Sequence, residues 1–145
     1  MTAEERKNIA YGYMTEGYNC CQSTVMAFKD YFNMSEEDLL KLTSTLGGGV
    51  GQMRSVCGAV SGMALVLGAV FGYEGTDRDT KQALNKRVQE LGGEFKKMNG
   101  SRSCFELTGL GPDCSTPKTR NDGRNCKDFV ADFAKLIAEY IEANK

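Results

Sequence analysis

Proline occurs only twice in the 145 residues, at Pro112 and Pro117, and both lie in one polar segment. Because proline interrupts helices, its absence elsewhere leaves the rest of the chain free to be helical. Apolar residues recur at spacings of three and four in several stretches, and no stretch sustains the alternation of a strand. The sequence therefore predicts an all-α fold, a single-domain compact bundle of about five to seven helices over residues 1–145 with essentially no sheet.

Capping residues and glycines set the expected helix limits. Asparagine and serine before apolar stretches predict helix starts, and glycine predicts the end of the first helix at Gly17. A pair of glycines, Gly92 and Gly93, is expected to weaken a long helix near its end. Residues 109–123 are expected to form the one long loop. The expected helices cover residues 3–16, 20–32, 35–46, an apolar stretch opening at 57, 78–98, 104–108 and 126–143.

Composition and charge exclude several function classes. The net charge is −1 and the pI is near 5.6, so no nucleic acid is expected as a partner. Histidine is absent, which excludes Ser-His-Asp triads, Cys-His pairs and histidine metal ligands. The charged N-terminus lacks the apolar core of a signal peptide, and glycines interrupt the longest apolar run, residues 56–72. We therefore expect a cytoplasmic protein without a membrane span.

Six cysteines in a cytoplasmic chain of this size are typical of metal-binding or redox-reactive proteins. Four of them fall at predicted helix N-termini, where the partial positive charge and unpaired N–H groups favour thiolate over thiol. The thiolate is the form that attacks disulfides and binds metals. The alternative reading is that each cysteine is a small buried apolar residue. The four candidate site residues are Cys20, Cys57, Cys104 and Cys126.

The other two cysteines are less informative. Cys21 adjoins Cys20 and is interpreted as a core residue or an auxiliary thiol, and Cys114 lies in the polar loop, as a chance surface residue or a resolving thiol. Three arginines lie close before cysteines in the sequence and could stabilise thiolates, although most surface arginines are simply solvated. They are Arg54, Arg102 and Arg124.

Two groups of glycines also stand out. The run from Gly47 to Gly51 resembles an anion-binding loop but lacks the full pattern of a nucleotide-binding loop. The alternative interpretation is a helix connector with its backbone close to the cysteines. In the apolar helix, glycines recur four residues apart, which predicts a face that another helix backbone approaches closely. These glycines are Gly58 and Gly62, then Gly68 and Gly72.

Several of these elements together resemble the C_GCAxxG_C_C family. They are Gly17-Tyr18-Asn19-Cys20, then Cys57-Gly58-Ala59-x-x-Gly62, then Cys104 followed by Glu106-Leu107 and Gly109, and then Cys126 before a C-terminal helix. The resemblance spans nearly the whole chain and implies a helical protein with a redox function assigned through those four cysteines. Cys21 stands where members more usually have alanine, and Cys114 is an addition, so neither inherits a role.

Three hypotheses follow. In the first, two of the four cysteines cycle between dithiol and disulfide, with Cys57 as the attacking thiol and a redox partner protein or a small-molecule thiol as the reaction partner. In the second, the same four thiolates, Cys20, Cys57, Cys104 and Cys126, hold zinc or an iron–sulfur cluster. In the third, the cysteines only pack within a non-catalytic helical binding or assembly module, for which a second copy of the chain is a candidate partner.

Overall fold

The computed structural model describes residues 1–112 and 122–145. Within these residues the chain forms seven α-helices, one short 3₁₀ helix and no strand, so the predicted all-α fold is confirmed. The helices are α1 (Ala3–Glu16), α2 (Cys20–Met26), the 3₁₀ helix η1 (Lys29–Tyr31), α3 (Glu36–Leu42), α4 (Gly58–Phe71), α5 (Arg78–Asn99), α6 (Cys104–Thr108) and α7 (Cys126–Asn144).

Most helix limits agree with the capping signals, and two expected helix ends were wrong. The second helix ends at Met26 instead of running to residue 32, because Phe28 leaves helical geometry before η1. The third helix ends at Leu42, four residues before its expected limit. The long helix expected over residues 78–98 is α5, which contains Gly92 and Gly93 and ends at Asn99. The predicted loop is described only at residues 109–112 and 122–123, so Cys114 lies outside the described residues.

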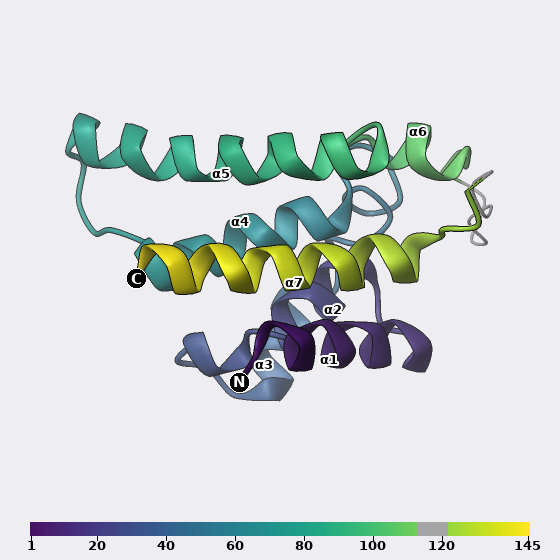
Figure 1. Ribbon diagram of the computed structural model, residues 1–145, viewed down its shortest axis with the longest axis horizontal. Coiled ribbons are helices and arrows are strands. Elements are labelled where there is room, and N and C mark those ends of the chain that lie inside the picture. The colour runs from purple at the N-terminus through teal and green to yellow at the C-terminus, as the bar shows by residue number, and fades with distance from the viewer. Residues whose placement is uncertain (113–121) are drawn as a thin grey trace.

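The helices form three layers (Figure 1). Helices α4 and α7 lie in the middle, α5 and α6 cover one side, and α1, α2 and α3 cover the other. The most extensive contact joins α1 to α7, followed by that between α2 and α4. The N-terminal ends of α4 and α7 lie at the same end of the bundle as α6, on the right in Figure 1. The topology therefore gathers several helix starts in one region.

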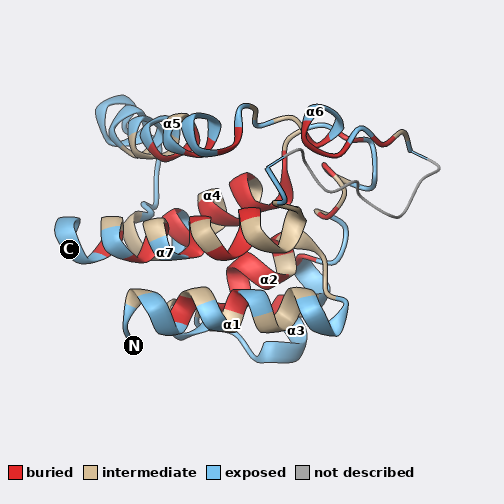
Figure 2. Ribbon diagram, turned by 45° about the vertical axis from the view of Figure 1, so that its right-hand side comes forward, coloured by how far each residue is buried: buried red, intermediate tan, exposed pale blue. Residues whose placement is uncertain are grey.

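The core lies between these layers (Figure 2). Its largest fully buried side chains include four phenylalanines, and Phe95 of α5 packs edge-on against Phe133 of α7 with ring centroids 4.9 Å apart. Such aromatic pairs stabilise a core beyond the effect of buried area alone. A smaller cluster around Cys21, Val25 and Leu39 joins α2 to α3. Among the described helices, none has the length and apolar character needed to cross a membrane.

The close approach of another helix, predicted from the glycine spacing in α4, is confirmed at Gly58 and Gly62. A Cβ on Gly58 would lie 2.7 Å from the backbone nitrogen of Cys21, and one on Gly62 would lie 2.8 Å from Cβ of Thr24. Helix α2 therefore packs against α4 at a distance that only glycine permits. A Cβ on Gly68 would meet no atom within 4 Å, so the expectation of close packing was wrong there.

Candidate functional site

All four predicted cysteines lie at helix N-termini in the structure. Cys20, Cys104 and Cys126 are the first residues of α2, α6 and α7, and Cys57 is the N-cap of α4. The preceding side chains of Asn19, Ser103 and Asn125 accept hydrogen bonds from backbone N–H groups in the first turns of their helices. These caps fix the helix starts and with them the positions of the cysteines.

The fold brings these four cysteines together around one small cavity. Its volume is about 10 Å³, which is room for roughly one water molecule. Cys57 and Cys104 are buried, with 6% and 7% of their surface exposed, and Cys20 and Cys126 are half-buried. The remaining lining residues are Gly48, Gly58, Leu107, Thr108 and Phe129.

A short antiparallel pairing fixes the start of α4 beside the start of α6. Val56 and Ser103 form an isolated β-bridge. The N–H of Cys57 donates to the carbonyl of Arg102 at 2.8 Å, and the N–H of Cys104 donates to the carbonyl of Ser55 at 2.6 Å. Each cysteine is therefore held by a backbone bond to the segment that carries the other. Sequence reasoning missed this pairing, because a single bridge has no extended alternation to reveal it.

Close packing of α2 against α4 brings Cys20 to the same cavity. A Cβ on Gly58, the first residue of α4, would lie 2.8 Å from Cβ of Cys20. A larger residue at that position would force α2 away from α4. The glycine that follows Cys57 in sequence is therefore what permits Cys20 to approach Cys57.

The glycine-rich connector contains the run from Gly47 to Gly51 and lies against the cysteines. Several of its residues have φ in the left-handed region. Gly49 has φ of 69°, and a Cβ there would lie 2.4 Å from the backbone nitrogen of Ser55. Positive φ recurs at Val50 and Arg54, residues for which this conformation is strained. Gly48 lines the cysteine cavity, which confirms the prediction of a connector with its backbone close to the cysteines.

This connector places a buried cation against the thiols. Arg54 is 8% exposed, and its Nη1 donates to Sγ of Cys104 at 3.7 Å. Its Nε donates to the carbonyl of Gly111 at 3.2 Å. The positive charge of Arg54 lowers the pKa of Cys126 and opposes the rise that burial causes in the pKa of Cys104. Arg54 is therefore positioned to stabilise negative charge on sulfur.

The other two arginines lie elsewhere. Arg124 donates to Asp132 at 2.7 Å and to the side chain of Asn99 at 2.6 Å, which ties the segment before α7 to α5. Arg102 extends along α5, where its Nη1 would lie 3.8 Å from a Cβ on Gly92. Among the three arginines considered from the sequence, the structure directs Arg54 toward the thiols.

The sulfurs of Cys20, Cys57 and Cys126 form a hydrogen-bonded group. Bonding of the Cys20 thiol to the sulfurs of Cys126 and Cys57, together with burial, raises the pKa of Cys20 well above its ordinary value. The same bonds are the main cause of the lowered pKa of Cys57 and of Cys126. Backbone N–H groups at the start of α4 lower the pKa of Cys57 further, although its sulfur makes no standard capping bond. Cys20 is therefore harder to ionise than an ordinary thiol, and Cys57 and Cys126 are easier to ionise.

Cys21 belongs to the smaller core cluster between α2 and α3. It is fully buried against Val25 and Leu39, and burial raises its pKa to about 11. A hydrogen bond with Ser61 opposes part of that rise in the pKa. The structure thus favours the core-residue interpretation of Cys21. The five described cysteines are all free thiols, and within the described chain no three cysteine or carboxylate side chains have the arrangement of a metal site.

This geometry defines a class of helical protein in which four helix starts, each with a cysteine, surround one buried cavity. The model of the family described as "Putative redox-active protein (C_GCAxxG_C_C)" matches residues 18–140. The chain therefore belongs to the C_GCAxxG_C_C family, and the matched range contains all six cysteines. Searches of curated proteins and of solved structures each gave no match.

Proposed function

We propose that the protein performs thiol–disulfide exchange, with Cys57 as the attacking thiolate. The observation that carries this proposal is the arrangement of three neighbouring sulfurs with opposed pKa shifts. The pKa of Cys57 is lowered and that of its hydrogen-bonded neighbour Cys20 is raised. A thiolate beside a retained thiol is what an attacking and a resolving cysteine require.

The exchange balances with a disulfide RSSR as the oxidant. The Cys57 thiolate attacks one sulfur of RSSR, forms a mixed disulfide and releases RS⁻. Cys20 then attacks the Cys57 sulfur, forms the Cys20–Cys57 disulfide and releases the second RS⁻. Two cysteines are oxidised and one disulfide is reduced to two thiols.

Cys126 has a defined part in the second step. The Cys20 thiol must lose its proton before it attacks, and the hydrogen-bonded sulfur of Cys126 accepts that proton. A negative charge on Cys126 raises the pKa of Cys57, so transfer of the proton to Cys126 also removes a charge that opposes the thiolate form of Cys57. Cys104, held against Arg54, completes the site as a fourth thiol.

The direct test compares two adjacent cysteines. Wild type, Cys20→Ser and Cys21→Ser are equilibrated with glutathione buffers of increasing oxidation, and the remaining thiols are alkylated and counted by intact mass. The proposal expects wild type and Cys21→Ser to lose two thiols together, because Cys21 packs in the core. Cys20→Ser should instead stop at a mixed disulfide with glutathione. Equal behaviour of the two variants would refute the assignment.

A metal or cluster at the same four thiols is the second candidate, and the observation that favours it is their convergence on one cavity from four helix starts. Four thiolates without histidine suit zinc or an iron–sulfur cluster. Elemental analysis and a visible spectrum of anaerobically purified protein separate the candidates. Stoichiometric metal that is lost in both Cys57→Ser and Cys104→Ser would establish the second candidate in place of the first.

We further propose a cytoplasmic location, where a small-molecule thiol or a redox partner protein would supply electrons.

A further inference from the structure

A second cavity lies against the outer side of the pairing that fixes Cys57 and Cys104. Its volume is about 410 Å³, within the range of small-molecule sites. The paired segments carry Ser55, Val56, Arg102 and Ser103 on this cavity, and each segment continues directly into a cysteine of the redox site. The remaining lining residues are Lys96, Gly100, Ser101 and Glu106.

The charges of this cavity have no partners within the described chain. Lys96 and Arg102 are cations and Glu106 is a carboxylate, and none of the three makes an ion pair or a side-chain hydrogen bond there. Elsewhere on the same helix, Lys97 pairs with Glu94 at 3.3 Å, so pairing is available on this surface. Three unpartnered charges around one cavity can therefore all serve a ligand.

The sign and number of these charges define the ligand. Two cations and one carboxylate complement a molecule with two carboxylates and one ammonium group. The hydroxyls of Ser55, Ser101 and Ser103 line the same cavity and can bond to peptide groups. Small thiol peptides of the glutathione type carry this set of groups.

We propose that this cavity binds a small thiol peptide with two carboxylates and one ammonium group, as the substrate or product of the adjacent cysteine site. Lys96 and Arg102 hold the carboxylates, and Glu106 holds the ammonium group. The inference rests on the proposed redox function for its role and on the cavity alone for binding. Thiol–disulfide exchange with such a ligand follows the balanced steps given above, with the peptide disulfide as RSSR.

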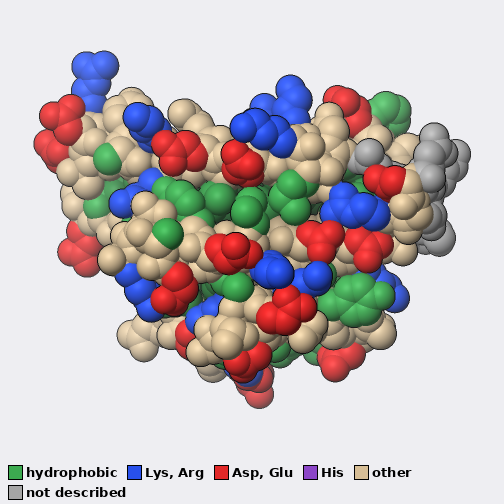
Figure 3. Space-filling view, viewed as in Figure 1, with side chains coloured by type: hydrophobic (Ala, Val, Ile, Leu, Met, Phe, Trp, Pro, Cys, Tyr) green, Lys and Arg blue, Asp and Glu red, His purple; other side chains and the backbone are tan. Residues whose placement is uncertain are grey.

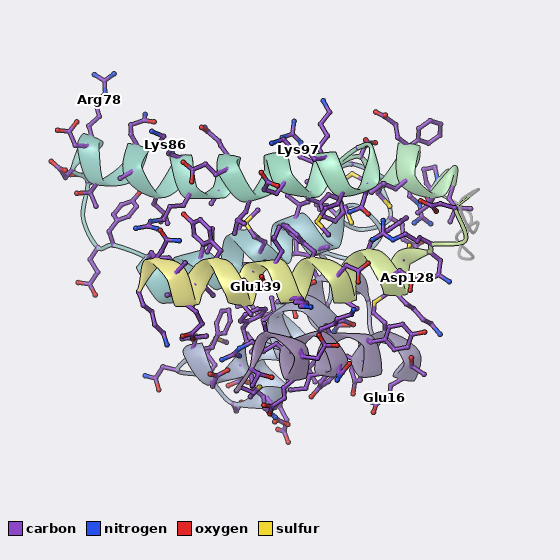
Figure 4. All side chains as sticks on the ribbon, viewed as in Figure 1. Glu16, Arg78, Lys86, Lys97, Asp128 and Glu139 are labelled. Atoms are coloured by element: carbon purple, nitrogen blue, oxygen red, sulfur yellow. The ribbon has the colours of Figure 1, made fainter. Side chains whose placement is uncertain are left out.

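Binding is tested with S-methylglutathione, which carries these charges and cannot exchange disulfides. Chemical-shift titration of the whole protein should show saturable shifts at the amides of Ser55 and Ser103. Lys96→Gln and Arg102→Gln should each weaken binding by roughly threefold, and the double variant by about tenfold, as expected for charge pairs of exposed side chains. Lys97→Gln is the matched control, because Lys97 is 77% exposed and is not among the residues that line the cavity. Figure 4 shows Lys97 on α5. It should leave binding unchanged.

Glu106→Gln tests whether the negative charge in the cavity binds the ammonium group of the ligand. It should weaken binding of S-methylglutathione and strengthen binding of glutarate, which has two carboxylates and no ammonium group. Absence of saturable shifts, or equal effects of Lys97→Gln and Arg102→Gln, would overturn the proposed site.

A separate assay keeps the two proposals apart. Reaction rates are measured with glutathione disulfide and with uncharged hydroxyethyl disulfide. Failure to react with either would overturn the redox function, whatever the binding result. Reaction with both at rates that Arg102→Gln leaves unchanged would support the redox function and overturn the role of this cavity.

Discussion

Titration of the buried Cys21 thiol should make the stability of the protein fall at alkaline pH. Burial raises the pKa of Cys21 to about 11, whereas the ordinary value for a thiol is 9.0. A group whose pKa is higher in the folded state stabilises the fold below its unfolded pKa, and this contribution is lost as pH rises toward the folded value. Between pH 8 and pH 10 the difference corresponds to about 1.3 kcal/mol of unfolding free energy.

Urea unfolding of wild type and Cys21→Ala at pH 8, 9 and 10 measures this contribution. The alanine variant is expected to be less stable at pH 8, because it loses buried volume. It should then lose about 1.3 kcal/mol less than wild type on going to pH 10, because it has no thiol to ionise at this position. The other thiols and the tyrosines titrate in both proteins and cancel in the comparison. Parallel loss of stability in the two proteins would refute the assignment of Cys21 to the core.

Three further predictions concern the cysteine site. Replacing Arg54 by Gln should raise the alkylation midpoint of Cys126, because a buried cation that lowers the pKa of Cys126 is removed. Arg78→Gln, on the exposed start of α5, should leave that midpoint unchanged. In wild type, the pH midpoint for modification of Cys57 by iodoacetamide should lie below the ordinary thiol pKa of 9.0. Mass spectrometry across the titration range measures this midpoint. A midpoint above 9.0 would contradict the proposed role of Cys57. Gly58→Ala should cost about 1–3 kcal/mol in urea unfolding, whereas Gly68→Ala, where a Cβ meets nothing within 4 Å, should be neutral or stabilising.

Much of the fold could be predicted because its signals are local. Asn19, Ser103 and Asn125 satisfy backbone N–H groups of the turns that follow them, so they mark helix starts in the sequence itself. Gly17 similarly ends α1 in the left-handed conformation that favours glycine. The same capping residues mark Cys20, Cys104 and Cys126 as the first residues of helices in the sequence itself.

The remaining features depend on tertiary structure. The strained φ of Arg54 arises from the way the connector closes on itself, and no sequence pattern marks an arginine for this conformation. The end of α2 at Met26 was missed, because the apolar spacing continues while the backbone changes to η1. Figure 3 shows a surface on which both signs of charge are interspersed, so surface charge density alone does not mark the cavity beside Ser103.

The most direct test of the proposed function is to identify the disulfide that forms. The Cys21→Ser protein is oxidised with glutathione disulfide, free thiols are alkylated, and the chain is digested and mapped without reduction. Removing the neighbouring thiol by this substitution makes the assignment of Cys20 unambiguous. The proposed mechanism predicts a cross-linked peptide joining Cys20 to Cys57, with Cys104 and Cys126 alkylated. Recovery of Cys20 and Cys57 as alkylated thiols after complete reaction would contradict it.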